Sequence, residues 1–254
     1  MDSGLTKPRR GGGEEEEHQQ QRKRHSSSTP SPSQASSSTP FDASLFTHTP
    51  FYCEENVYLL CKKLCAIGVA DPFAIDLFVV FISNENRQVP LWCQKASKHV
   101  DGLVLWDYHV ICIQSKRSRD RHTLPLVWDL DSSLPVPFPL NRYSNEVVRP
   151  SVSLHSKYKR LFRVVHAPTF LRCFASDRRH MKDLNGNWQA KPPTYDPIVS
   201  EDGTVNNLDE YIRISSADVV ANIGDLVTSL FSSKLGVMLS ETQFEIFFSL
   251  IHQQ

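Results

Sequence analysis

A cysteine, a histidine and an aspartate occupy positions from which they could act together in nucleophilic catalysis. Cys53 comes directly before a stretch in which Val57, Leu60, Cys61 and Leu64 are spaced as on one face of a helix. The start of a helix offers unbonded N–H groups and the positive end of the helix dipole. Both favour a thiolate, and the N–H groups can hold an oxyanion. The pattern therefore indicates a reactive thiol, with a small buried core cysteine as the alternative.

Charged residues at the two ends of this predicted helix follow the helix dipole. Glu54 and Glu55 fall in its first turn, and Lys62 and Lys63 lie near its end. The two glutamates also oppose the formation of a thiolate at Cys53, because like charges repel.

A thiol nucleophile needs a base, and His109 is the first candidate. It interrupts an otherwise apolar stretch, 103–113, which we expect to form one long strand. An imidazole in such a place can take the thiol proton and later protonate the leaving group. The alternative is a core histidine satisfied by hydrogen bonds. His166, at the end of another apolar stretch, is the second choice.

The base works best when a third group orients it, and Asp129 is the candidate for that group. A hairpin joining 103–113 to the alternating stretch 124–131 would place Asp129 near His109. Asp131 is the second choice, and a solvent-facing strand residue is the alternative for Asp129. The chain order of cysteine, histidine and aspartate is shared by papain-like and transglutaminase-like thiol enzymes.

Composition separates the N-terminal segment from the rest of the chain. The 254 residues carry 28 basic and 28 acidic side chains, so no overall charge points to nucleic acid or membrane as a partner. Residues 1–45 hold acidic, basic and Gln runs followed by repeated Ser, Thr and Pro, which predicts disorder. Residues 46–254 are then expected to form a single catalytic domain.

The location of the protein is predicted from what the sequence lacks. It has no apolar leader segment and no run of 18 apolar residues, so we expect a soluble cytoplasmic protein. Arg22-Lys23-Arg24 could serve as a nuclear address, which makes the nucleus a second location, although a solvated charge run is the alternative. Disulfides among the six cysteines are not expected in that compartment.

The remaining pattern predicts an α+β domain in which the cysteine-bearing helix packs on an antiparallel sheet. Leu77–Ser83 is a buried strand candidate, Val89–Trp92 an edge strand, and Leu161–His166 a further strand. The final third, 211–252, is expected to be mostly helical, and Glu241–Ile251 is its clearest part.

Several longer strings carry a resemblance to a known family. They occur in this order: Tyr52-Cys53-Glu54-Glu55-Asn56, Val80-Phe81-Ile82-Ser83-Asn84-Glu85, Trp106-Asp107-Tyr108-His109-Val110, Asp129-Leu130-Asp131, Leu161-Phe162-Arg163-Val164, the run 174–183, and Gly186-Asn187-Trp188. Together they resemble the protein N-terminal glutamine amidohydrolase family, whose hallmark is the string WDYHV. The resemblance covers about residues 50 to 209.

The resemblance implies a papain- or transglutaminase-like thiol hydrolase fold and hydrolysis of the side-chain amide of an N-terminal glutamine. Ammonia is released, and the new N-terminal glutamate enters the N-degron pathway of arginylation and ubiquitin-dependent degradation. Motif by motif, Cys53 falls on the nucleophile, His109 on the base and Asp129 on the orienting acid. A monomer that needs neither a metal nor an organic cofactor is implied, with the N-terminal Gln of proteins and peptides as the partner.

Substrate-binding residues are expected beside these motifs. The candidates are Tyr52, Glu55, Ser83, Asn84, Trp106, Asp107 and Asp131. A free α-amino group calls for a carboxylate or carbonyl partner, and the sequence does not rank Glu54, Glu55, Asp107 and Asp131 for this role. Helix-end or surface charge is the alternative for each acid, and core packing is the alternative for the tryptophan.

The last third departs from the family pattern, and 217–254 is therefore expected to be atypical. Leu235-Gly236-Val237 stands where a Trp-Gly pair is expected. Two other classes of protein remain open: a thiol peptidase or transglutaminase, and a catalytically silent module that binds N-termini.

Overall fold

The computed structural model of the chain describes residues 41–116 and 124–251. Most of the segment predicted to be disordered, and the basic run at 22–24, lie outside the described residues. Both interpretations therefore stay predictions. Within the described residues, none of the helices has the length and apolar character that a membrane span needs.

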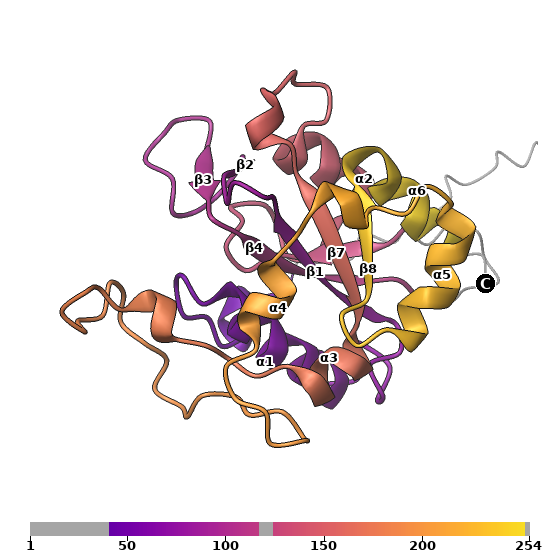
Figure 1. Cartoon of the computed structure of the whole chain (residues 1–254). Helices are drawn as coiled ribbons and strands as arrows, with labels where there is room; N and C mark the ends of the chain where they lie inside the picture. Colours follow the sequence, from indigo (N-terminus) through magenta and orange to yellow (C-terminus); the bar gives the residue numbers. More distant parts are fainter. Residues whose placement is uncertain (1–40, 117–123, 252–254) are drawn as a thin grey trace, which may run out of the picture. The chain divides into compact units, whose positions relative to one another are not determined.

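A six-stranded antiparallel sheet forms the centre of the fold, with the strand order β6-β5-β4-β1-β7-β8 (Figure 1). Its strands are β1 (Leu77–Ser83), β4 (His109–Gln114), β5 (Leu126–Trp128), β6 (Phe138–Pro139), β7 (Leu161–His166) and β8 (Val237–Ser240). Every residue of β1 and β4 is buried, because apolar layers cover both faces of the sheet.

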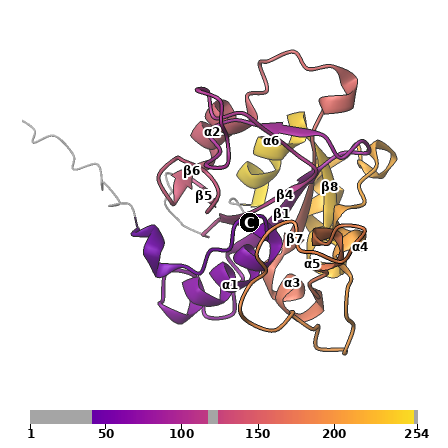
Figure 2. The same cartoon turned by 90° about the vertical axis from the view of Figure 1, so that its left-hand side faces the viewer.

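Helices cover the two faces of this sheet. They are α1 (Cys53–Ala66), α2 (Leu140–Tyr143), α3 (Ala167–Cys173), α4 (Leu208–Ile212), α5 (Ile223–Ser232) and α6 (Glu241–Ile251). Residues of α1, α3 and α4 belong to one apolar cluster, and residues of α2, α5 and α6 belong to the other. Figures 1 and 2 show α1 and α3 on one side of the sheet and α5 and α6 on the opposite side. The predicted α+β class is confirmed, and so is the antiparallel sheet beneath the cysteine-bearing helix.

Helix α1 follows its sequence pattern closely. Val57, Leu60, Cys61 and Leu64 are all buried against the sheet, as the helical spacing predicts. Gly68, at a φ of +71°, lies in the turn that follows the helix, a backbone conformation that glycine adopts without steric strain.

The expected long strand 103–113 is wrong. The chain forms β3 (Val104–Trp106), which pairs with β2 (Val89–Leu91) in a separate two-stranded sheet, and only then enters β4. The break falls at Asp107 and Tyr108. Trp106 packs against one apolar cluster and Tyr108 belongs to the other, so the alternation of side chains shifts where the chain changes sheet. Asp107 is thereby left in a turn beside the start of β4.

The expectation of a mostly helical final third is correct for α6 and wrong for β8. Helix α6 has the predicted bounds, Glu241–Ile251, but β8 precedes it and pairs with β7. Gly236 directly precedes β8 and has a φ of +67°. A side chain at this position would collide with the carbonyl oxygen of Val164 in β7. The glycine is therefore required for β8 to lie next to β7.

Candidate active site

The cysteine lies at the first position of α1. Cys53 is 7% exposed, and Tyr52 precedes the helix without a side-chain cap. The Asn56 amide nitrogen donates to the carbonyl of Thr49 at 2.8 Å, and the Thr49 N–H donates to the Asn56 side-chain oxygen at 2.8 Å. These two bonds hold the segment before the helix against its first turn, and so fix the direction from which the chain reaches Cys53.

His109 and Asp129 come together as the sequence predicts. His109 opens β4, Asp129 follows β5 directly, and the two strands pair antiparallel. The Nε2 atom of His109 donates to Oδ1 of Asp129 at 3.0 Å, in a place where neither side chain is more than 2% exposed. The predicted neighbourhood of these two residues is therefore confirmed.

Asp129 is held by two further donors. The Tyr143 hydroxyl donates to its Oδ2 at 2.7 Å, and the backbone N–H of Asp131 donates to its Oδ1 at 3.0 Å. Burial acts to raise the pKa of Asp129, but His109, Tyr143 and the Asp131 N–H together outweigh it and hold the pKa below its ordinary value. The carboxylate is thus charged and fixed in one orientation.

The imidazole of His109 is clamped on its other side as well. Trp106 stacks on it with ring centroids 5.4 Å apart and planes at 16°. Burial acts to lower the pKa of His109, but the charge and hydrogen bond of Asp129, with further help from Asp131 and Glu54, raise it above its ordinary value. Because Nε2 is engaged by Asp129, the second ring nitrogen, Nδ1, is the available base. It is buried and has no hydrogen-bond partner among the described residues.

The surroundings of the Cys53 sulfur are acidic. The backbone N–H of Val110, the residue after His109, donates to the sulfur, and the thiol contacts Oε2 of Glu54 at 3.7 Å. Burial raises the pKa of Cys53 well above its ordinary value, and the negative charges of Glu54, Asp131 and Asp107 add to the effect. The expectation that the helix start favours a thiolate is therefore wrong for the free protein, since burial and three nearby acids outweigh the helix dipole.

Glu54 is itself perturbed by its position. It is fully buried, accepts the Tyr108 hydroxyl at 2.9 Å on Oε2, and leaves Oε1 without a partner among the described residues. Burial raises its pKa to about 7. The Tyr108 hydroxyl also lies 3.4 Å from Nε2 of His180. It therefore connects Glu54 to the segment after α3 that carries His180.

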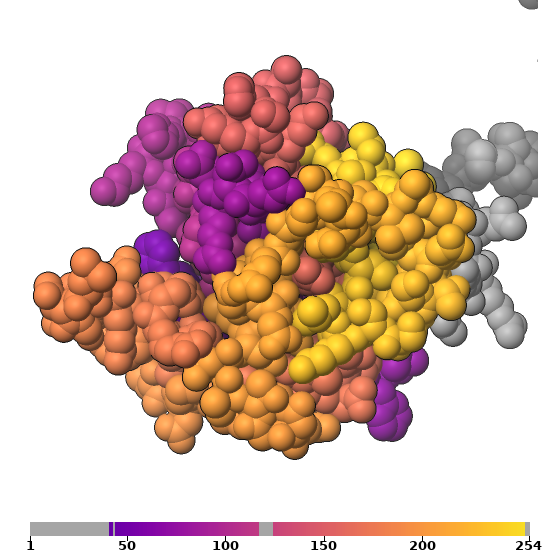
Figure 3. Space-filling model, in the orientation of Figure 1, coloured from indigo at the N-terminus to yellow at the C-terminus, as the bar shows by residue number. Residues whose placement is uncertain are grey.

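A cavity of about 380 Å³ opens onto Cys53. It is lined by Phe51, Cys53, Val104, Leu105, Trp106, Asp107, Tyr108, Asp131, His180, Met181, Gln189 and Ala190. These residues come from the start of α1, from β3 with the bend after it, from the segment after β5 (Asp131) and from the segment after α3. In the space-filling view of Figure 3, indigo atoms from the first part of the described chain show between the magenta region of β2 and β3 and the salmon segment after α3.

Of the seven predicted substrate-binding residues, three line this cavity and four do not. Trp106, Asp107 and Asp131 line it. Asp131 also accepts Nε2 of His48 at 2.7 Å. His48 was missed by the sequence analysis, because no local pattern links it to a residue 83 positions away.

The other four predicted residues lie outside the cavity lining. Tyr52 is fully buried, and its hydroxyl donates to the carbonyl of Ala190 at 3.4 Å. Ser83 donates to the carbonyl of Asp107 at 3.3 Å. Asn84 donates to three backbone carbonyls and accepts two backbone N–H groups, so it organises the turn after β1.

Glu55 holds the outer wall of the cavity in place. It is fully buried, and Nε and Nη2 of Arg178 donate to its two carboxylate oxygens, both at 2.8 Å. The Glu55 hydrogen bond is the main cause that raises the pKa of Arg178 above its ordinary value. Ser176 accepts the N–H of Ile198 at 2.7 Å, and His180 donates to the carbonyl of Asp177 at 2.7 Å. These contacts fix the conformation of the loop that carries Ser176 and His180.

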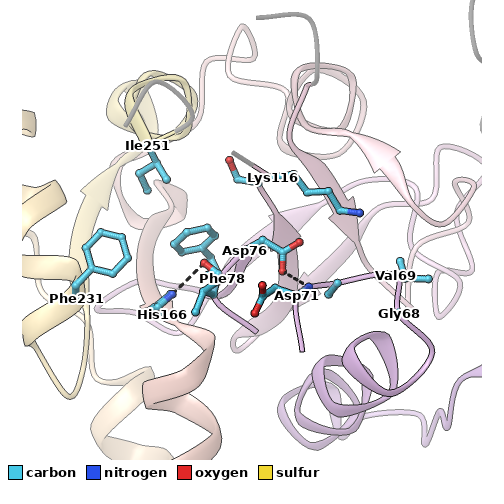
Figure 4. Close-up of a pocket in the computed structure, with 12 residues that line it drawn as sticks. Gly68, Val69, Asp71, Asp76, Phe78, Lys116, His166, Phe231 and Ile251 are labelled. Carbon is cyan, nitrogen blue, oxygen red and sulfur yellow. Dashed lines mark hydrogen bonds between the residues drawn. The ribbon is translucent and has the colours of Figure 1, made fainter. Parts of the chain in front are cut away.

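A larger cavity, of about 550 Å³, lies elsewhere in the fold (Figure 4). Figure 4 shows Phe78, Phe231 and Ile251 among its apolar walls and Asp71, Asp76 and Lys116 among its polar ones. His166, the second choice for the base, lines this cavity, and its Nε2 bonds to the carbonyl of Ile75 at 3.1 Å. Cys53, His109 and Asp129 are not among its lining residues. The chemistry of the thiol therefore belongs to the smaller cavity.

One group of potential metal ligands occurs among the described residues. His109, Asp129 and Asp131 each offer one ligand atom within 4.8 Å of the others. The His109 and Asp129 atoms already bond to each other, and Asp131 bonds to His48. Nε2 of His109, Oδ1 of Asp129 and Oδ1 of Asp131 are thus engaged in hydrogen bonds within the protein, whereas Nδ1 of His109 has no such bond in the described part of the chain.

Comparison with known proteins gives the family. The model of the family described as N-terminal glutamine amidase matches residues 48–248. A protein N-terminal glutamine amidohydrolase of Arabidopsis thaliana is 58% identical over 209 residues, which cover 82% of this chain and 94% of the relative. One of Oryza sativa subsp. indica is 58% identical over 208 residues, which cover 82% of this chain and 89% of the relative. One of Bos taurus is 37% identical over 179 residues, which cover 70% of this chain and 81% of the relative. The chain belongs to the N-terminal glutamine amidase family.

Proposed function

We propose that this protein hydrolyses the side-chain amide of an N-terminal glutamine in proteins and peptides, giving N-terminal glutamate and ammonia. The proposal rests on membership of the family and on the names of relatives that are up to 58% identical. The observation that carries it is a cavity that opens onto the Cys53 thiol, next to the strand β4, which begins with His109, and His109 is hydrogen-bonded to Asp129 after β5.

The three residues have distinct roles in the proposed reaction. Cys53 is the nucleophile and His109 its general base and acid. Asp129 orients the ring and stabilises its charged form. The buried Nδ1 atom of His109, which has no partner among the described residues, supports this assignment because Nε2 is already committed to Asp129.

The first half-reaction transfers the acyl group to sulfur. His109 Nδ1 takes the thiol proton as the Cys53 sulfur attacks the δ-carbonyl carbon of the glutamine. Backbone N–H groups at the start of α1 hold the oxyanion that develops, since the first turn of a helix has unbonded donors. The C–N bond breaks as the His109 N–H gives its proton to the leaving nitrogen, which departs as ammonia and leaves a thioester.

The second half-reaction regenerates the enzyme. His109 removes a proton from water, whose oxygen attacks the thioester carbonyl. The C–S bond breaks, the sulfur regains a proton from His109, and the new side-chain carboxyl group leaves as part of glutamate. The raised pKa of His109 suits an imidazole that must carry a proton in both halves of the cycle.

Wider parts of the proposal concern the fold class and the cellular setting. We propose that the helix bearing Cys53 and the sheet bearing His109 and Asp129 form a papain- or transglutaminase-like thiol hydrolase core. We also propose a monomeric cytoplasmic enzyme, with the nucleus as a second location, that supplies N-terminal glutamate to the N-degron pathway. Residues 46–254 would form the catalytic domain and 1–45 a disordered tail.

A mass-spectrometric assay with three peptides tests the proposed activity. The first begins with glutamine, the second is the same peptide with an acetylated α-amino group, and the third carries its only glutamine internally. We expect ammonia and the small mass gain of replacing –NH2 by –OH from the first peptide alone. A shortened peptide would indicate a thiol peptidase, a joined amine would indicate a transglutaminase, and binding without turnover would indicate a silent module.

A further inference from the structure

The cavity that opens onto Cys53 has a strongly acidic lining. Asp107 and Asp131 are its carboxylates, His180 is its one basic side chain, and it contains neither lysine nor arginine among its described lining residues. Glu54 adds a third acid beneath the sulfur, at 3.7 Å. Uncompensated negative charge in a partly enclosed site attracts a cation. The α-ammonium group of a polypeptide N-terminus is such a cation.

Two polar atoms near the thiol also lack a hydrogen-bond partner in the described part of the chain. Oε1 of Glu54 and Nδ1 of His109 are buried and have no hydrogen-bond partner among the residues described. Glu54 contacts the Cys53 sulfur, and His109 directly precedes the residue whose N–H donates to it. Buried polar atoms are normally satisfied, so these two unsatisfied atoms are an unusual feature of the surroundings of the thiol.

Four acids lie near the thiol, and they differ in their burial and in the partners they already bind. Glu55 is buried and neutralised by a bidentate Arg178. Glu54 is also fully buried and does not line the cavity. Asp131 lines the cavity, but its Oδ1 is bound to His48 at 2.7 Å. None of these three is a free carboxylate on the cavity wall.

Asp107 is different from the other three acids. It lines the cavity, is exposed to it, and forms no ion pair within 41–116 and 124–251. Its Oδ1 accepts the backbone N–H of Tyr108 at 3.0 Å, which fixes the orientation of the carboxylate. Its negative charge is close enough to the thiol to act on Cys53.

We propose that Asp107 is a specificity-determining residue that binds the α-ammonium group of the substrate's N-terminal glutamine. This inference rests on the proposed function. When sulfur attacks the δ-carbon, the α-nitrogen lies four bonds away, about 5 Å in an extended side chain. A carboxylate on the wall of the cavity that holds the thiol is suited to that reach.

The same contact has a consequence for the nucleophile. Negative charge around Cys53 opposes the loss of its proton, and a bound ammonium group cancels part of that charge. A substrate with a free α-amino group would therefore be bound and also activate the thiol that attacks it. Internal glutamines and blocked N-termini lack this cation. Both would therefore bind weakly and leave the thiol unactivated.

The test compares two peptides on two variants of the full chain. One peptide begins with glutamine, and the other is identical except that hydrogen replaces its α-amino group. For Asp107→Asn we expect kcat/KM for the first peptide to fall about 100-fold, as loss of a charge partner in a binding site typically produces. We expect kcat/KM for the second peptide, already low in the wild type, to stay within about threefold, because a contact to an absent group cannot be lost.

Glu245→Gln is the matched control, because it removes the same charge from the exposed face of α6. It should leave both rates at the wild-type value. Equal losses of Asp107→Asn on both peptides, or no loss on either, would overturn the inference. A wild type that releases no ammonia from the first peptide would instead contradict the proposed function. The thermal midpoint of Asp107→Asn should match that of the control, since Asp107 is exposed.

Discussion

The buried pair of Glu55 and Arg178 gives a prediction whose size follows from the structure. The change is Arg178→Met, which keeps an unbranched apolar stem and removes the guanidinium group. Glu55 is fully buried, and the Arg178 side chain is only 10% exposed. Two hydrogen bonds of 2.8 Å are lost, and the carboxylate of Glu55 is left buried without its cation.

Removing one partner of a buried ion pair costs about 3–5 kcal/mol, because the remaining charge stays desolvated. The partial exposure of Arg178 admits some water, so we expect the lower end, about 3 kcal/mol. For a domain of this size such a loss lowers the thermal midpoint by about 6–12 °C. Since Arg178 also holds the segment that brings His180 and Ala190 to the cavity, the deamidation rate should fall as well.

Urea unfolding followed by circular dichroism measures the free energy of unfolding of wild type, Arg178→Met and the double variant Glu55→Gln/Arg178→Met. The double variant removes both charges, and we expect it to recover to within about 1 kcal/mol of the wild type. A loss below about 1 kcal/mol in Arg178→Met would refute the reasoning, because an exposed pair behaves in that way. A double variant no more stable than the single one would refute it equally.

Two further predictions concern the partners of Asp129. Tyr143→Phe removes one hydrogen bond to the carboxylate, so we expect kcat to fall about tenfold with KM unchanged, in line with the loss of a bond to a charged group. The control is Tyr211→Phe, whose lost hydroxyl is buried without a partner among the described residues; equal losses in the two variants would contradict the assignment. NMR titration of His109 should give a lower midpoint in Asp129→Asn than in the wild type, because the charge and hydrogen bond of Asp129, the main groups that raise the pKa of the ring, are lost while burial still lowers it. An unchanged midpoint would show that Asp129 does not set the pKa of the ring.

Local patterns in the sequence located several elements well. The run Leu77–Ser83 is β1 with the same bounds, and the helical spacing after Cys53 is α1. The neighbourhood of His109 and Asp129 was also predictable, since a hairpin pairing brings consecutive strands together. Each of these features depends on periodicity or on adjacency in the chain.

What the sequence could not show depends on contacts between distant segments. The stretch 103–113 contains no glycine or proline, so nothing local reveals that β3 and β4 belong to different sheets. Tyr143 reaches Asp129 and Arg178 reaches Glu55 only in the folded chain. The raised pKa of Cys53 likewise reflects burial and acids brought in by folding, which a helix-start argument does not include.

The proposed reaction depends on attack of the Cys53 sulfur on the amide. The most direct measurement is the initial rate of ammonia release from a saturating Gln-initiated peptide by Cys53→Ala, relative to the wild type. We expect the rate to fall to background while the thermal midpoint stays near that of the wild type. A folded variant that retains more than about one per cent of the wild-type rate would contradict it, because loss of a nucleophile normally removes far more.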